Sequence, residues 1–204
     1  QLITVSARTG TGLQQACAEL AAHLRADPSV DLADVAFTRL QGRAGFGARR
    51  AVVARSAQQA AELLDSTDTR SMIAGRRGAM EPTVAFMMPG GGAQYASMGA
   101  GLYRSEQVYR EAIDACCAIA DPLLGLRLRE LMHPATDIEQ ASERLERPGV
   151  ALPALFATGY AMARLLRSKG IQPSAMIGHS AGEYVVACLA GVMSFEDCIG
   201  LVLL

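Results

Sequence analysis

One stretch of the sequence combines residue types and spacing that could support nucleophilic catalysis. Residues 178–182 read Gly-His-Ser-Ala-Gly, between an apolar run and a segment rich in small residues. This pattern is typical of a nucleophile elbow, in which a strand, a sharp turn and a helix present a serine at the apex. We therefore predict that Ser180 is a nucleophile, with Gly178 and Gly182 admitting the tight turn. The following helix would point its free N–H groups at the serine.

A serine hydroxyl becomes an effective nucleophile only when a base, usually a histidine, removes its proton. The sequence has three histidines. His23 falls in a predicted helix, and His133 precedes a proline in a polar segment that we expect to be exposed. His179 is next to Ser180, but neighbouring side chains on such a turn point in different directions. The sequence favours none of the three, so we expect the base to lie outside these residues.

A second glycine-rich segment follows a predicted strand over residues 83–88. Residues 89–94 read Pro-Gly-Gly-Gly-Ala-Gln. A strand followed by a glycine-rich turn directs backbone N–H groups at an oxygen, which could belong to an oxyanion or to a phosphate. The segment lacks the Gly-Lys-Ser/Thr ending of a phosphate-binding loop, and its glycine spacing does not fit the dinucleotide fingerprint. We therefore favour an oxyanion-binding role.

The composition is that of an ordinary globular protein. Of the 204 residues, 50% are hydrophobic and 19% are charged, and the net charge is −1. Such a charge balance gives no basic field for nucleic acid or an anionic membrane. The five cysteines show no metal-ligand spacing, so we predict no metal site and a reducing, cytoplasmic compartment. The apolar stretch 150–166 contains Pro153 and Arg164, which favours a buried helix over a membrane span.

The chain divides into two regions of different character. From residue 81 onward strands alternate with helices, which indicates an α/β architecture with a mainly parallel sheet. Residues 1–80 form a predicted small α+β unit with no convergent acid, base or nucleophile. The last helix reaches Leu204 without a cap or stop signal, so we expect the sequence to belong to a longer protein.

Several element boundaries are predicted from proline and from polarity. We expect one helix to end at Pro122 and another to have Pro153 in its first turn. Residues 67–78 and 133–148 are predicted to be polar connections.

Together these segments resemble the acyltransferase domains of modular type I polyketide synthases. Residues 84–95 resemble the opening of such domains, and residues 153–157 and 178–184 follow in the right order and spacing. Residues 1–80 resemble the linker between ketosynthase and acyltransferase. Residues 81–204 would then be the first part of the α/β-hydrolase-like large subdomain, without the ferredoxin-like subdomain.

The resemblance implies a ping-pong acyl transfer. Ser180 would take an acyl group, typically malonyl, from coenzyme A and pass it to the phosphopantetheine thiol of an acyl carrier protein. Backbone N–H groups of Gly91 and Ala181 would hold the oxyanion. No covalently bound cofactor is implied, and the partners would be the carrier protein, the ketosynthase and other domains of the same synthase. The predicted substrate-binding residues are Gly90, Gly92, Gln94 and His179.

The sequence departs from the family pattern at two positions. Gly91 and Leu152 stand where the family commonly has glutamine, which changes side-chain contacts but preserves the N–H of residue 91. Ala181 favours a malonyl unit, because methylmalonyl-type domains often carry glutamine after the serine. The catalytic histidine and the arginine that pairs with the substrate carboxylate would lie beyond Leu204, so we expect the 204-residue chain alone to be inactive.

Two alternatives use the same residues differently. A serine hydrolase or thioesterase would share Ser180 but release the acid to water, and it would leave residues 89–94 and 1–80 without a role. A non-catalytic scaffold between domains would fit residues 1–80.

Overall fold

The computed structural model describes residues 1–68, 70–78 and 82–204. The chain forms two compact units, Gln1–Pro82 and Thr83–Leu204, each with its own buried apolar core. The boundary predicted after residue 80 lies outside the described residues. Because each unit has a separate core, the two are described one at a time.

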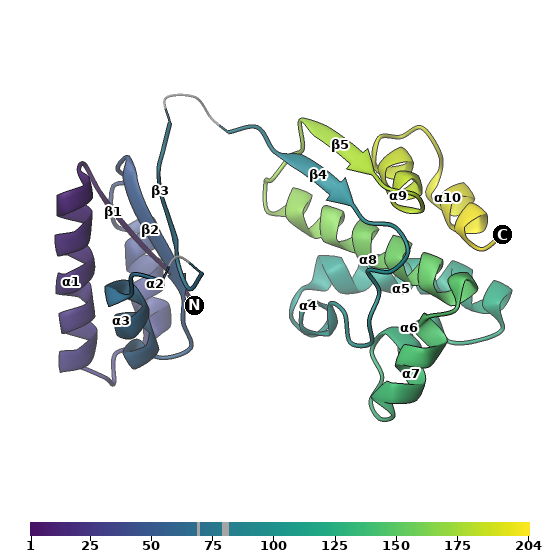
Figure 1. The fold of residues 1–204 in the computed structure, drawn as a ribbon, viewed down its shortest axis with the longest axis horizontal. Coiled ribbons are helices and arrows are strands. Elements are labelled where there is room, and N and C mark those ends of the chain that lie inside the picture. The colour runs from purple at the N-terminus through teal and green to yellow at the C-terminus, as the bar shows by residue number, and fades with distance from the viewer. Residues whose placement is uncertain (69, 79–81) are drawn as a thin grey trace. The chain divides into compact units, whose positions relative to one another are not determined.

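The first unit is a three-stranded antiparallel sheet covered by helices (Figure 1). The strands lie in the order β1-β2-β3, and α1 and α3 pack on each other and on the sheet while α2 contacts β1. The element bounds are β1 Leu2–Ala7, α1 Gly10–Ala26, α2 Leu32–Gln41, β2 Ala48–Val53, α3 Ala57–Asp65 and β3 Ile73–Arg76.

Alternate side chains of β1 are buried, because one face of the strand lies against the helices. Ile3 and Val5 are buried while their neighbours along the strand are less so, as expected for a strand with one covered face. The helices begin at polar caps. The side chains of Thr9, Asp31 and Ser56 accept hydrogen bonds from backbone N–H groups in the first turns of α1, α2 and α3.

The interpretation of residues 67–78 as a polar connection is wrong, because they contain β3. Its sequence, Ile-Ala-Gly-Arg, has no alternating apolar pattern, and all four side chains are exposed. The strand forms through backbone pairing with β2, in a register that places Ala51 opposite Ile73. Because no side chain of β3 is buried, its sequence lacks the apolar alternation that would have predicted a strand.

The second unit contains a two-stranded parallel sheet with helices packed on one side of it (Figure 1). β4 and β5 pair in parallel from Ala85 opposite Ala175 to Met88 opposite Gly178. The predicted α/β architecture with a parallel sheet is confirmed for this unit. The element bounds are β4 Ala85–Met88, α4 Ala100–Ser105, α5 Gln107–Leu124, α6 Leu128–Met132, α7 Ile138–Leu145, α8 Pro148–Ser168, β5 Ala175–Gly178, α9 Gly182–Leu189 and α10 Phe195–Val202.

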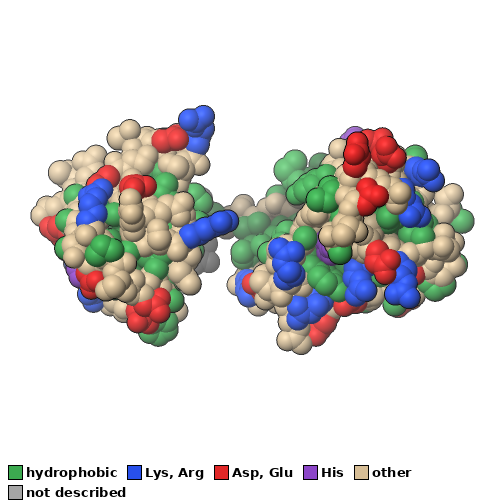
Figure 2. Space-filling view, turned by 90° about the horizontal axis from the view of Figure 1, so that it is seen from below, with side chains coloured by type: hydrophobic (Ala, Val, Ile, Leu, Met, Phe, Trp, Pro, Cys, Tyr) green, Lys and Arg blue, Asp and Glu red, His purple; other side chains and the backbone are tan. Residues whose placement is uncertain are grey.

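The core of the second unit lies mainly between α5 and α8. Tyr109 and Ile113 on α5 and Phe156 and Ala157 on α8 are all almost completely buried. By length and composition α8 could cross a membrane, but 56% of its most apolar window is buried inside the fold. The second unit also intersperses basic and acidic side chains over the face seen in Figure 2.

Three helix boundaries differ from the prediction. α5 continues through Pro122 to Leu124 and is capped by Gly125, whose φ of 63° is left-handed. α8 begins at Pro148, the favoured first position for proline, and Pro153 lies buried inside the helix. Residues 133–148 contain the amphipathic helix α7, which buries only Ala141 and Leu145. Gly125 and Pro148 are themselves local signals for a helix end and a helix start, and they give the boundaries better than Pro122 and Pro153 do.

His133 is not the exposed residue that the sequence indicated. Its Nε2 lies 3.0 Å from the carbonyl oxygen of Met98, and its ring packs on Tyr103 with centroids 4.9 Å apart. Since a carbonyl only accepts, Nε2 donates. Burial lowers the pKa of His133 below the usual 6.5, although the bond to Met98 acts in the opposite direction. The folded state therefore favours the neutral imidazole.

We expect His133 to make the second unit less stable in mild acid. As pH falls through about 6.5, the unfolded state takes up the proton first, so the free energy of unfolding decreases. The variant His133→Gln keeps an N–H donor but cannot titrate. Urea denaturation followed by circular dichroism at about pH 5.5 and pH 7.5 should show a smaller loss for the variant than for the wild type. His23 and His179 are present in both proteins and cancel, so equal losses would contradict this assignment.

Candidate active site

Ser180 lies at the apex of a turn between β5 and α9, and its side chain is exposed. Its φ is 51°, in the left-handed region. For a residue with a Cβ atom this conformation costs roughly 1–2 kcal/mol, so the surrounding structure must hold it. The strand, turn and helix predicted around the serine are therefore present, with the strain expected of a nucleophile elbow.

The expectation that the first N–H groups of α9 are free to face the serine is wrong for three of them. They are used within the turn and first helical turn: Gly182 donates to His179 O at 2.9 Å, Glu183 to Ser180 O at 3.0 Å and Tyr184 to Ala181 O at 3.2 Å. Among the described residues, the N–H of Ala181 donates no hydrogen bond. It is thus the amide beside the serine that remains available for an oxyanion.

The elbow touches the end of β4 through backbone atoms. The N–H of His179 donates to the carbonyl of Met88 at 2.9 Å. A Cβ added at Gly182 would lie 2.3 Å from that same oxygen and 2.7 Å from the carbonyl oxygen of Pro89. A Cβ at Gly178 would lie 2.4 Å from the nitrogen of Glu183. No side chain fits at either glycine unless the backbone shifts.

The glycine-rich segment 89–94 lies directly against the serine. A Cβ added at Gly90 would be 2.7 Å from the carbonyl oxygen of His179 and 3.0 Å from the Cβ of Ser180. The side chain of Gln94 accepts a 2.8 Å hydrogen bond from the N–H of Gly92, whose φ is 102°. Gln94 therefore shapes this loop from within. The structure brings together the two segments that the sequence singled out, although they are about ninety residues apart.

The two positions that depart from the family pattern are neighbours in space. A Cβ added at Gly91 would lie 3.8 Å from Cδ2 of Leu152, an ordinary van der Waals distance. Leu152 is half-buried near the start of α8. Among the described residues, the N–H of Gly91 donates no hydrogen bond. The exposed loop thus offers a second available amide, with an apolar side chain beside it.

No described histidine is hydrogen bonded to the hydroxyl of Ser180. The ring of His179 is turned toward the loop, since its Nδ1 would lie 2.9 Å from a Cβ at Gly90. His133 is engaged with Met98, and His23 is exposed on α1. The described residues also contain no group of three His, Cys, Asp or Glu side chains that could hold a metal ion.

Met88 is a site residue that sequence reasoning missed. Its contribution is a carbonyl oxygen that receives the His179 N–H and contacts Gly182. Any residue type would supply that oxygen, so the side chain carries no signal of the role. Only the position of Met88, at the end of a predicted strand before the glycines, could have indicated it.

The geometry can be compared with known proteins. The acyl transferase domain family matches residues 85–204, which is more than half of the chain. The chain belongs to the acyl transferase domain family. A second family, described as CurL-like, PKS C-terminal, matches residues 1–64.

Curated relatives and solved structures agree with this assignment. The chain is 35% identical over 201 residues to polyketide synthase GfsE of Streptomyces halstedii. It is 33% identical over 205 residues to erythronolide synthase EryA2 of Saccharopolyspora erythraea. These matches cover 95% and 98% of the chain but only 5% and 6% of the two relatives.

The solved acyl transferase domain of ZmaA is 40% identical, with a TM-score of 0.90 over 100% of this chain and 47% of that one. The acyl transferase domain of SpnD is 39% identical, with a TM-score of 0.85 over 99% and 47%. The resemblance to polyketide synthase acyltransferase domains and the mixed α/β fold are confirmed, and the chain spans about half of such a domain.

We expect Gly182→Ala to destabilise the second unit by about 1–3 kcal/mol, because the new methyl group would meet the Met88 carbonyl. Gly200→Ala is the matched control, since Gly200 lies inside α10 with open space around it. A glycine-to-alanine change inside a helix is stabilising by about 0.5–1 kcal/mol. Urea denaturation followed by circular dichroism measures both. Equal stability of the two variants would refute the close approach.

Proposed function

We propose that this chain carries the nucleophile of an acyltransferase that moves an acyl group, preferably malonyl, from coenzyme A to an acyl carrier protein in polyketide biosynthesis. The observation that carries the proposal is the contact of the Ser180 elbow with the loop at Gly90. A strained serine beside two available amides is suited to acyl transfer through a tetrahedral intermediate. Membership of the acyl transferase domain family supports the same chemistry.

The proposed reaction has two similar steps. The Oγ of Ser180 attacks the thioester carbon, the carbonyl oxygen becomes an oxyanion, and the C–S bond then breaks. The serine proton passes through the base to the departing thiol of coenzyme A. The phosphopantetheine thiol of the carrier protein next attacks the seryl ester and restores the hydroxyl. The N–H groups of Gly91 and Ala181 would hold the oxyanion, and one such donor is worth roughly 10²–10³ in rate.

The remaining residues of the site have supporting roles in this proposal, some direct and some indirect. Gly90 and Gly92 allow the loop to approach the acyl group, and the His179 ring lies over the loop. Gln94 acts by fixing the loop through Gly92, so its effect on the substrate is indirect. Leu152 would place an apolar side chain beside the acyl group near Gly91.

The first unit would connect this domain to a ketosynthase. The match of residues 1–64 to the CurL-like, PKS C-terminal family supports a position within a synthase. One solved structure with 34% identity is a type II PKS acyl-carrier protein in complex with its malonyl-transacylase. This supports a carrier protein as the acyl acceptor. We also propose a cytoplasmic location, which the five free cysteine thiols support.

We expect Ser180 to be acylated when the domain is complete. Residues 1–204 can be joined to the remaining half of the ZmaA domain, its 40% identical relative, and incubated with malonyl-CoA. Intact-mass spectrometry should show one malonyl group, absent in Ser180→Ala. Ser174→Ala is the control, because its hydroxyl only bonds the carbonyl of Val84, at 3.1 Å.

Labelling of the Ser180→Ala chimera, or none in the parent chimera, would contradict the nucleophile assignment. If the labelled chimera instead released mostly malonate with a carrier protein present, the hydrolase alternative would replace acyl transfer. The two products are separated by chromatography.

The 204-residue chain alone is expected not to acylate itself with malonyl-CoA. The physical reason is that no described histidine is hydrogen bonded to the Ser180 hydroxyl, so no base is in place to remove its proton. The same mass measurement, run beside the chimera, tests this. Stoichiometric label on the short chain that disappears in Ser180→Ala would overturn it.

A further inference from the structure

The segment 89–99, which joins β4 to α4, is anchored at its far end by the end of α6. The N–H of Ser97 donates to the carbonyl of Met132 at 2.7 Å. The Nε2 of His133 donates to the carbonyl of Met98 at 3.0 Å, across a separation of 35 positions. The last carbonyls of a helix have no partner inside it, so that of Met132 is available for this role. Two consecutive residues of the segment are thus bonded to two consecutive residues at the end of α6.

The anchored residues have a backbone conformation that needs support. The φ angle is 70° at Ser97 and 71° at Gly99. A left-handed serine is unfavourable by itself and persists only where its surroundings hold it. The fully buried side chain of Tyr109 on α5 lies so close to Gly99 that an added Cβ would overlap its hydroxyl. Helices α5 and α6 together therefore fix the place where the segment ends.

Packing alone does not account for a histidine at position 133. The ring of His133 packs on Tyr103 with the centroids 4.9 Å apart, as a phenylalanine ring could. Its Nδ1 is buried and has no hydrogen-bond partner among the described residues, which is unfavourable in a protein interior. The ring offsets this cost through Nε2, whose N–H reaches Met98. The contribution particular to this histidine is thus its bond to the segment 89–99.

We propose that His133 is a positioning residue for acyl transfer, which holds the Gly91 amide in place for the oxyanion through its bond to Met98. The inference rests on the proposed function and adds a residue to it. Gly91 lies between Gly90, which contacts the elbow, and the anchored Met98. Since the N–H of Gly91 donates no hydrogen bond in the described part of the chain, its direction depends on how the segment is held. An oxyanion amide acts on the tetrahedral intermediate, so its displacement slows acylation and leaves the binding of the thioester almost unchanged.

The test uses the chimera with the remaining half of the ZmaA domain. Intact-mass spectrometry measures the rate of Ser180 acylation at a series of malonyl-CoA concentrations. His133→Phe keeps a ring but removes the N–H donor, and its maximal rate should be about tenfold lower, with the half-saturating concentration within about twofold. His133→Gln restores an N–H donor and should recover the maximal rate to within about threefold of the wild type. A residue that only filled space would not respond to the donor in this way.

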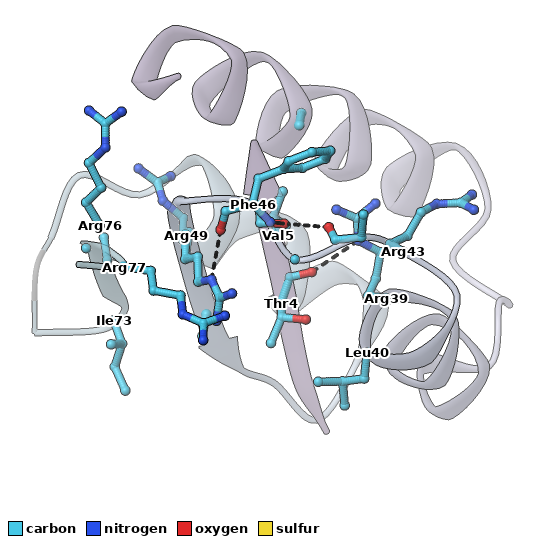
Figure 3. Close-up of a pocket in the computed structure, with 18 of the residues that line it drawn as sticks. Thr4, Val5, Arg39, Leu40, Arg43, Phe46, Arg49, Ile73, Arg76 and Arg77 are labelled. Atoms are coloured by element: carbon cyan, nitrogen blue, oxygen red, sulfur yellow. Dashed lines mark hydrogen bonds between the residues drawn. The ribbon is translucent and has the colours of Figure 1, made fainter. Parts of the chain in front are cut away.

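Two control variants should keep the maximal rate within about twofold of the wild type. Arg39→Met removes a bond of the same kind from the first unit, because the Nε of Arg39 donates to the carbonyl of Thr4 at 3.1 Å, also across 35 positions (Figure 3). Ile199→Val removes one carbon from a buried side chain of α10, a helix that packs on α5, α8 and α9. The first variant controls for the loss of one hydrogen bond, and the second controls for mild destabilisation of the second unit.

Hydrogen exchange of the 204-residue chain tests the anchor without any activity. In His133→Phe the backbone amides of residues 89–99 should exchange about fivefold faster than in the wild type, while those of α8 stay unchanged. In His133→Gln both regions should match the wild type. Mass spectrometry of proteolytic peptides measures the exchange of each region.

Three results would overturn the role of His133 while the label on the parent chimera still supports the proposed function. They are an equal loss of rate in the Phe and Gln variants, a change in the half-saturating concentration alone, and unchanged exchange of residues 89–99 in His133→Phe. An unlabelled parent chimera would overturn the proposed function and this inference with it.

Discussion

The second unit depends on a contact between two stretches of backbone. The end of β4 and the turn after β5 approach so closely that the Met88 carbonyl both accepts the His179 N–H and excludes any side chain at Gly182. This contact fixes the loop at Gly90 beside Ser180. Both candidate oxyanion amides therefore take their positions from it.

The strain at Ser180 is sustained by packing behind the elbow. A left-handed serine persists only where its surroundings over-determine it. α8 supplies those surroundings: a Cβ added at Gly159 would lie 3.4 Å from Val185 on α9 and 3.6 Å from the sulfur of Met88 on β4. At Gly159, α8 therefore packs against both α9 and the end of β4. The core between α5 and α8 thus serves as the platform for the turn.

The sequence allowed the elbow and its loop to be predicted because their signals are local. Glycines at fixed positions around Ser180, after a short apolar run, indicate a strand, turn and helix without knowledge of the rest of the fold. What could not be predicted depends on partners distant in the chain. β3 exists through pairing with β2, and Gln94 bonds within its own loop rather than facing outward.

The pairing of β4 with β5 also determines when the serine acquires its shape. Ser174 bonds Val84 across a separation of 90 positions, whereas the helices in between are closed by contacts within a few residues. Bringing β4 and β5 together costs conformational entropy before any contact between them can compensate for it. We therefore expect the local helices to form first. The strained turn is then among the last features to appear as the chain folds. Formation of this turn would accordingly report that β4 and β5 have paired.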